Sequence, residues 1–402
     1  MEVRFDEEQF VVVDIGTGTI KAGFSGQDLP LVVIPTVMGE KEIEIDAGIG
    51  QQNQNEQVKK KSEKTFGNEA FAKRAEMDQL FHPVKRGIIE DYDKLDDILT
   101  HIFHTELGVD PRSMNVLLTD CPLSTKEHKM KIAEIMFTKH KVKSLALQNT
   151  AVLSLFSTGT TTGLVAECGE GVTYTVPVFE GYALPHAMHN INVAGGDVTR
   201  KLIDELQDCN APVKDEHYQF VQDIKENMCY VSQDYAEELN MMDDPLTQEQ
   251  RSYELPGNHV IEVNHHKRIT AAECLFDPSK VGVTMQEFDC TGGIAQLAYQ
   301  SIEKCDSDLK IGLYNNIVLA GGTTLMKRFP ERFDYELRKF ARGEAKTDIN
   351  INPALNRKYA AWVGGSMLAS FSTFSDMTIK LTDYQEITET EKSTAILKKT
   401  IY

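Results

Sequence analysis

Two short glycine turns of the same design constrain this chain more than any other feature of its sequence. The first, at residues 14–21, follows three β-branched residues and leads into a second apolar run. This pattern predicts a buried β-hairpin rather than a strand that turns into a helix. Glycines in such a turn let backbone N–H groups surround an anion, and nearby hydroxyl and ammonium groups add donors. The residues expected to bind phosphates here are Gly16, Thr17, Gly18, Thr19 and Lys21.

Asp14 decides which anion this turn suits. A carboxylate beside the turn would repel a bare phosphate, so the arrangement fits a metal–nucleotide better, with Mg²⁺ held by Asp14 through water. The spacing G-x-G-x-x-K, with no helix after it, matches neither a Walker loop nor a dinucleotide-binding turn. Taken alone, a turn of this kind is more often an ordinary hairpin connection.

A second copy of the turn, at residues 163–177, strengthens the prediction that the first turn binds phosphate. It repeats the order of strand, acid-x-Gly-x-Gly and strand, with Glu167, Gly169 and Gly171 in the acidic and glycine positions. Two such hairpins in two halves of a chain can face one another and hold one phosphate chain between them.

Length and charge exclude several classes of protein. A chain of 402 residues is too long for one core and indicates two or three domains. The net charge of −19 argues against direct binding to nucleic acid or to an anionic membrane surface. Seven scattered cysteines without a C-x-x-C pair indicate reduced thiols, and no apolar run approaches the length of a membrane span. We therefore expect an intracellular protein without membrane insertion.

Between residues 83 and 157 strands and helices alternate, which predicts an α/β layer architecture. We expect a helix over 91–107, a buried strand over 115–120 and a helix that Ser124 caps, with Glu127 in capping-box position. Before this region, residues 39–65 are polar and charged and are expected to form a solvated, mobile loop.

The second half carries two further glycine turns. Gly195 precedes Asp197, which is expected to cap a helix, and a turn at residues 321–324 is expected to lead into another helix capped by Thr323 or Thr324. Lys225 and Glu226 lie on a predicted helix over 223–231, pointing away from its inner face; a surface ion pair is the simplest interpretation. The polar tail from residue 382 is expected to be mobile.

With these pieces placed, the chain resembles actin and the actin-related proteins over nearly its whole length. Each motif alone is weak, but their order and spacing are specific. The motifs lie at residues 14–24, 151–156, 169–173, 184–186, 223–226, 252–256, 320–324, 357–359 and 364–366.

The resemblance implies the fold class shared by actins, sugar kinases and heat-shock chaperones. That fold has two related α/β domains with ATP or ADP and Mg²⁺, or Ca²⁺ in its place, in the cleft between them. The implied domains are 1–157 with 358–402, including a projecting small subdomain at about 36–82, and 158–357, with an outer subdomain at about 194–270. The implied metal-side acids are Asp14 and Glu167. The implied phosphate loops are the first turn and residues Gly169, Glu170, Gly171 and Val172. The residues implied to hold ribose and adenine are Gly195, Asp197, Lys225, Glu226, Gly321, Gly322, Thr323, Met326 and Lys358.

Five positions depart from the family pattern. Glu167 and Glu170 stand where actins have aspartates, and each extra methylene displaces the carboxylate by roughly an ångström, which an octahedral Mg²⁺ shell tolerates poorly. Cys168 replaces a serine that donates to the terminal phosphate, and a thiol is a poor donor. Thr150 stands at the position of the glutamine that orients the attacking water, and Tyr174 at that of the neighbouring histidine. Losing both catalytic groups predicts slow or absent ATP hydrolysis.

The main hypothesis is that the protein is a nucleotide-stabilised structural subunit. Its expected partners are actin-like subunits or the subunits of a multiprotein complex. A polar 39–65 segment and a charge at Lys280, in a loop that is apolar in actins, favour it over the main alternative, a divergent conventional actin that forms filaments and hydrolyses ATP. A third alternative, a small-molecule kinase of the same fold, lacks an identifiable catalytic base. The expected location is the cytoplasm and cytoskeleton, with cilium or nucleus as alternatives.

Overall fold

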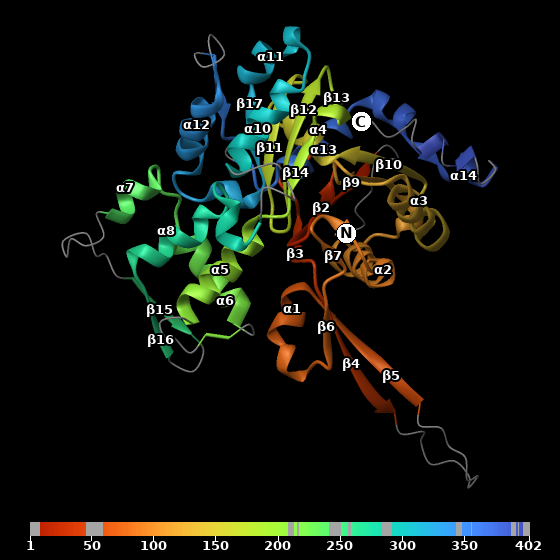
Figure 1. The fold of residues 1–402 in the computed structure, drawn as a ribbon. Coiled ribbons are helices and arrows are strands. Elements are labelled where there is room, and N and C mark those ends of the chain that lie inside the picture. Colours follow the sequence, from red (N-terminus) through yellow and green to blue (C-terminus); the bar gives the residue numbers. More distant parts are fainter. Residues whose placement is uncertain are drawn as a thin grey trace.

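The computed structural model describes residues 9–45, 59–207, 213–214, 217–240, 251–255, 259–283, 292–342, 348–354, 356–386, 391–392 and 394–396. Two mixed β-sheets, each with helices on its outer side, form the two halves of the molecule (Figure 1). This arrangement confirms the predicted α/β fold class.

The first sheet has six strands in the order β19-β10-β9-β1-β2-β3. Its bounds are β1 (Phe10–Ile15), β2 (Thr19–Phe24), β3 (Val32–Pro35), β9 (Asn115–Asp120), β10 (Ser144–Asn149) and β19 (Ile379–Lys380). Strands β1, β9 and β10 run parallel, whereas β1, β2 and β3 form an antiparallel meander. The first predicted hairpin is therefore the β1–β2 hairpin, next to the edge strand β3 of this sheet.

The second sheet repeats this plan in the order β13-β12-β11-β17-β18, with β14 also paired to β12. Its bounds are β11 (Gly163–Cys168), β12 (Thr173–Phe179), β13 (Tyr182–Ala183), β14 (His189–Ile191), β17 (Ile317–Ala320) and β18 (Ile351–Asn352). Strands β11 and β12 form the second predicted hairpin, and β11, β17 and β18 run parallel.

Two helices, α4 (Thr150–Phe156) and α13 (Ala360–Leu368), pack between the two sheets. Val152 of α4 contacts the second sheet, while its neighbour Leu153 contacts the first. Likewise, Ala360 of α13 contacts the second sheet and Trp362 contacts the first. The Trp362 indole donates to the Val12 carbonyl of β1 at 3.0 Å. The α4–α13 pair therefore joins the two halves by packing against both sheets.

The outer face of the first sheet is covered by α2 (Tyr92–His101) and α3 (Lys126–Ile135), which continue as single π-helical turns at Ile102–Glu106 and Met136–His140. The outer face of the second sheet packs on a larger helical layer. Its helices are α5 (Gly195–Gln207), α6 (Tyr218–Met228), α8 (His265–Glu273), α10 (Gly293–Glu303), α11 (Ser307–Tyr314) and α12 (Phe329–Phe340).

Smaller elements extend from both halves. From the first project β4 (Met38–Ile45), β5 (Lys59–Phe66), α1 (Gly67–Ala72), β6 (Gln79–Phe81), β7 (Val84–Lys85) and β8 (Ile88–Ile89), and near the C-terminus lies α14 (Leu381–Glu386). From the second extend α7 (Tyr235–Asn240), β15 (Arg251–Leu255) and β16 (His259–Val263). Short 3-10 helices lie at Arg74–Glu76, Pro111–Ser113, Pro185–Ala187, Pro278–Val281, Gly322–Leu325 and Ser372–Met377. In the described part of the chain, no helix combines the length and the apolarity that a membrane crossing requires.

The prediction of a solvated loop over 39–65 was wrong for residues 39–45 and 59–65, which form strands. Strands β4 and β5 pair there as a hairpin that points away from the body of the molecule (Figure 1). Its register sets Glu40 opposite Lys64 and Lys41 opposite Glu63, so that charges of opposite sign face each other across the strands. The middle of the segment, 46–58, lies outside the described residues.

Three local predictions also need correction. Thr125, not Ser124, caps α3 by accepting a hydrogen bond from the His128 amide, so Glu127 is not in capping-box position. Neither Thr323 nor Thr324 caps a helix, because a 3-10 helix with Gly321 at its start follows β17. The tail is partly ordered: α14 buries Tyr384 against the first core, and Ile396 is also buried there.

Candidate functional site

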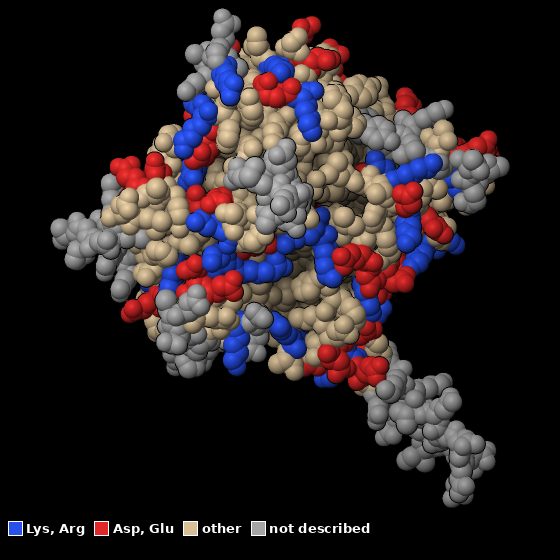
Figure 2. Space-filling view, in the orientation of Figure 1, with Lys and Arg blue, Asp and Glu red and all other residues tan. Residues whose placement is uncertain are grey.

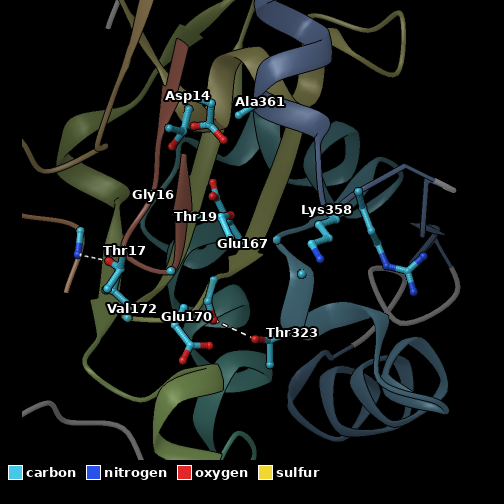
Figure 3. Close-up of a pocket in the computed structure, with 18 of the residues that line it drawn as sticks. Asp14, Gly16, Thr17, Thr19, Glu167, Glu170, Val172, Thr323, Lys358 and Ala361 are labelled. Carbon is cyan, nitrogen blue, oxygen red and sulfur yellow. Dashed lines mark hydrogen bonds between the residues drawn. The ribbon is translucent and has the colours of Figure 1, made fainter. Parts of the chain in front are cut away.

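A cavity of about 380 Å³ opens between the β1–β2 and β11–β12 hairpins (Figure 3). Helix α4, helix α6, the turn after β17 and the start of α13 complete its walls. A second cavity of about 1120 Å³ adjoins it and shares Thr17, Gly18 and Glu170. On the face drawn in Figure 2, Lys and Arg side chains gather around the hollow near the middle of the molecule.

The first cavity brings together most of the residues that the sequence singled out. Those that line it are Asp14, Gly16, Thr17, Gly18, Thr19, Lys21, Thr150, Glu167, Gly169, Glu170, Gly171, Val172, Tyr174, Lys225, Glu226, Gly321, Gly322, Thr323, Met326 and Lys358. Gly195 and Asp197 do not line it. Gly195 lies behind the second turn, where its amide donates to the Gly169 carbonyl, and Asp197 is in the first turn of α5 rather than at its cap.

The two glycine turns have the same backbone hydrogen bond and touch each other. The Gly16 amide donates to the Thr19 carbonyl at 3.1 Å, and the Gly169 amide donates to the Val172 carbonyl at 3.2 Å. A Cβ on Gly18 would lie 2.9 Å from the Glu170 Cβ, and one on Gly171 would lie 2.6 Å from the Thr17 hydroxyl oxygen. Glycine is therefore required at both contacts for the turns to come this close.

Asp14 is held by two neighbours at the end of β1. Its carboxylate accepts a hydrogen bond from the Thr119 hydroxyl at 2.8 Å and forms an ion pair with Lys21, also at 2.8 Å. Lys21 thus offsets the charge of Asp14 beside the first turn, a role that the sequence analysis had given to a metal alone.

Glu167 is the more unusual acid. Burial, and then the nearby charge of Asp14, raise the pKa of its carboxyl from 4.5 to about 7, against a hydrogen bond from Thr150. One of its oxygens, Oε2, is buried without a hydrogen-bond partner although the residue lines the cavity. An unpartnered buried carboxylate oxygen beside a second carboxylate fits a divalent cation. No group of three or more His, Cys, Asp or Glu suited to a metal occurs among the described residues, and Mg²⁺ needs only one or two carboxylates when phosphates and water complete its shell.

The far wall of the cavity corrects the prediction for Lys225. This lysine is buried rather than directed to the surface, and its ammonium donates to the Gly195 carbonyl at 3.0 Å and lies 3.4 Å from Glu170. Glu226 is exposed and accepts from Gln222, so the two residues do not form the surface ion pair. Thr323 donates to the Gly169 carbonyl at 2.8 Å (Figure 3), which ties the turn after β17 to the second glycine turn.

Comparison with known proteins gives one decisive match: a family model described as Actin covers residues 5–395. The chain belongs to the actin family. The match spans nearly the whole sequence and agrees with two α/β halves around a cavity.

Thr150 and Tyr174, which the resemblance to actins placed at the family's catalytic positions, both line the cavity. Thr150 is the first residue of α4 and directly follows Asn149, whose side chain caps the helix. The Tyr174 hydroxyl lies 2.6 Å from the Cys121 thiol, and burial raises the pKa of this tyrosine above its ordinary value. Burial likewise raises the pKa of Cys121 to about 11, so both groups stay protonated near neutral pH.

Several residues that line the cavity were missed by sequence reasoning. They are Ile15, Gly87, Cys121, Pro122, Ser154, Gln222, Asn227, Leu325, Arg357 and Ala361. Of these, Ile15, Ser154 and Arg357 lie in family motifs that the sequence analysis had recognised. Gly87 and Cys121 follow strands at some distance in sequence from either turn, so no local pattern marks them.

Proposed function

We propose that this actin-family protein binds ATP or ADP with Mg²⁺ in the cavity between its two hairpins. The observation that carries the proposal is the pair of glycine turns, alike in their hydrogen bonding, that meet across a cavity containing an unpartnered buried carboxylate oxygen. Backbone amides of both turns, with Lys21, would hold the phosphates. The ribose and adenine would lie toward Met326 and Lys358. The proposed domains, 1–157 with 358–402 and 158–357, would meet at this cavity.

Glu167 would hold the cation directly or through water, with Asp14 beside it; Ca²⁺ could take the place of Mg²⁺. When bound, the cation would neutralise phosphate charge. The other task in hydrolysis is to position a water and accept its proton. Thr150 has a short side chain, and the Tyr174 hydroxyl is engaged with Cys121. We infer that hydrolysis is weak or absent.

We further propose that the protein is a structural subunit of a larger assembly, in the cytoplasm or cytoskeleton, rather than a self-assembling filament protein. The charged β4–β5 hairpin supports this, since it projects from the body of the molecule. Lys280 also supports it, because its side chain is exposed in the 3-10 helix Pro278–Val281, with Asp277 3.9 Å away, and burying this charge in a filament contact would be costly.

The test of the nucleotide proposal separates binding from turnover. Calorimetry should detect uptake of Mg²⁺-ATP, while phosphate release by the wild type should be far slower than by the Thr150→Gln, Tyr174→His double variant. Equal turnover of the two proteins would argue against the catalytic part of the proposal, and no uptake would refute the binding part. Sedimentation of purified protein with Mg²⁺-ATP tests the assembly role, because robust filaments without any partner would favour a conventional actin.

A further inference from the structure

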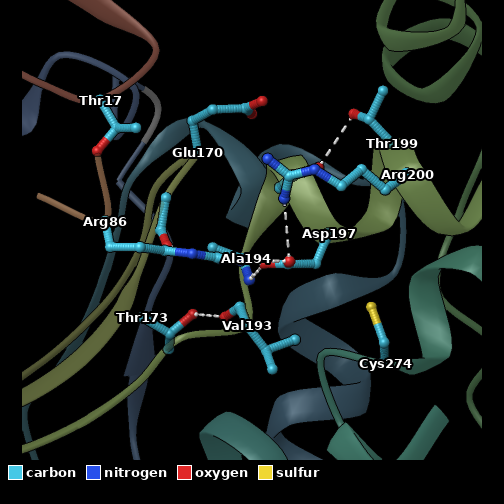
Figure 4. A network of polar contacts seen from close by, with 12 residues as sticks. Thr17, Arg86, Glu170, Thr173, Val193, Ala194, Asp197, Thr199, Arg200 and Cys274 are labelled. Atoms are coloured by element: carbon cyan, nitrogen blue, oxygen red, sulfur yellow. Dashed lines mark hydrogen bonds and ion pairs between the residues drawn. The ribbon is translucent and has the colours of Figure 1, made fainter. Parts of the chain in front are cut away.

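A single arginine on the β7–β8 hairpin connects the two halves of the molecule at the rim of the cavity. The Arg86 guanidinium donates to both carboxylate oxygens of Asp197, at 2.5 and 2.7 Å, and to the Gly171 carbonyl at 2.9 Å (Figure 4). Arg86 belongs to the first half, whereas Asp197 and Gly171 belong to the second. Bidentate pairing of this kind fixes orientation as well as distance.

The backbone next to Arg86 holds the first glycine turn. The Gly87 amide donates to the Thr17 hydroxyl at 2.8 Å. A Cβ on Gly171 would lie 2.6 Å from the Thr17 hydroxyl oxygen and 3.0 Å from the Arg86 Cα. The tip of the β7–β8 hairpin is therefore in contact with both phosphate-binding turns.

The tip of the hairpin holds Arg86 in a backbone conformation that long side chains rarely adopt. Arg86 has φ of +49° and Gly87 has φ of +78°, in a two-residue turn between the paired residues Lys85 and Ile88. Such turns favour Asn, Asp or Gly at their first central position, and a longer side chain in this region costs about 1 kcal/mol or more.

Asp197 is oriented to receive Arg86. Its carboxylate also accepts from the Ala194 amide at 2.9 Å and from Arg200, one turn further along α5, at 3.2 Å. Only 11% of the Asp197 side chain is exposed, against 34% for Arg86. The aspartate that the family resemblance assigned to the nucleotide is thus occupied by a side chain of the opposite half.

We propose that Arg86 is a positioning residue: through Asp197 and Gly171 it clasps the two halves together, keeps the glycine turns apposed and slows nucleotide release. Gly87 lines the nucleotide cavity while Arg86 lines the adjoining wider one, so the clasp lies where the two cavities meet. The effect on nucleotide rests on the proposed function, whereas the contact between the halves does not.

The chain offers a matched control, since Arg200 bonds the same carboxylate without crossing between the halves. Dissociation of a fluorescent ATP analogue from full-length protein, chased with unlabelled Mg²⁺-ATP, should be about tenfold faster for Arg86→Ala and change by less than about twofold for Arg200→Ala. Arg86→Lys should fall between, because an ammonium cannot bridge both oxygens in the same way. Equal acceleration by Arg86→Ala and Arg200→Ala, or none by either, would overturn the proposal.

Two further measurements test the proposal if Arg86→Ala does not fold or if the protein binds no nucleotide. Asp197→Asn keeps an acceptor for the Ala194 amide but removes the charge, so it should also accelerate release if Arg86→Ala does not fold; an unchanged rate would count against the clasp. Hydrogen exchange on nucleotide-free protein should show faster exchange of the Gly87 amide and of residues 168–172 in Arg86→Ala but not in Arg200→Ala. If the wild type binds no nucleotide, the proposed function fails, and this exchange pattern alone decides whether the clasp exists.

Discussion

Glu167 makes the stability of the empty protein depend on pH in an unusual direction. Its pKa is raised from 4.5 to about 7 by burial and by Asp14, so between these values the folded chain binds more protons than the unfolded chain. The free energy of unfolding should therefore fall as pH rises from about 4.5 to about 7, by up to about 3 kcal/mol. We expect Glu167→Gln to match the wild type at pH 5 and to exceed it at pH 8, in urea unfolding with EDTA and without nucleotide.

Mg²⁺-ATP supplies the control for this prediction. If the cation binds the Glu167 carboxylate, added Mg²⁺-ATP should stabilise the wild type at pH 8 more than it stabilises the Glu167→Gln variant. A difference in stability between the two proteins that stays constant from pH 5 to pH 8 would contradict the raised pKa.

Among individual residues, the sequence could predict those whose role is local. It could not predict those whose role depends on a partner distant in sequence. The glycines of both turns were predictable because a turn is specified by a few consecutive residues. Arg86 was not, since its partner Asp197 lies 111 residues away. Nor was the contact of Tyr174 with Cys121, 53 residues apart. The resemblance to a family assigned Asp197 to the nucleotide, whereas in this structure its carboxylate accepts from Arg86 and Arg200.

The crossing of helices α4 and α13 leaves no room for a side chain at Gly364. A Cβ there would lie 1.8 Å from the Leu153 carbonyl oxygen, a backbone atom that cannot move without shifting α4. Gly364→Ala should therefore destabilise the protein by about 3 kcal/mol, measured by chemical denaturation, because it separates the pair of helices that joins the two sheets.

Gly312 provides the matched control in helix α11. It is also helical, but it is exposed, and nothing lies within 4 Å of a Cβ at this position. Gly312→Ala should stabilise the protein by about 0.5–1 kcal/mol, because alanine loses less backbone entropy on folding. Similar effects of the two substitutions would show that propensity, not the close helix contact, governs Gly364.

Elements with an apolar face were predictable and the charged hairpin was not. Strand β9 and helix α4 follow directly from runs of buried residues. Strands β4 and β5 carry many charges, which are offset by their mutual register and by ion pairs to helix α2, where Lys94 pairs with Glu40 and Asp97 with Lys64. A pattern that depends on pairing two segments is invisible when each is read alone. The cap of α3 was misplaced by one residue because Ser124 and Thr125 are adjacent residues that are both good caps.

For the whole molecule, the two halves have separate cores that share few elements. One buried cluster packs the first sheet on α2 and α3, and a second packs the other sheet on its outer helices. What joins them is the α4–α13 layer and the contacts around the cavity. A ligand held by both glycine turns would therefore add a further link between the halves at the cavity.

This arrangement predicts how the chain melts. Scanning calorimetry without nucleotide in EDTA should give a broad or divided transition, because each core can unfold separately. Mg²⁺-ATP binds only when both turns are in place, so at about 100 times its dissociation constant it should add about 2.7 kcal/mol to the stability of both halves together. The transition should then become single, with a midpoint that rises with ligand concentration. ATP with EDTA is the control, since it supplies the nucleotide without the cation that Glu167 is expected to hold. Two transitions that shift independently, or an equal shift with EDTA present, would mean that no metal–nucleotide bridges the halves.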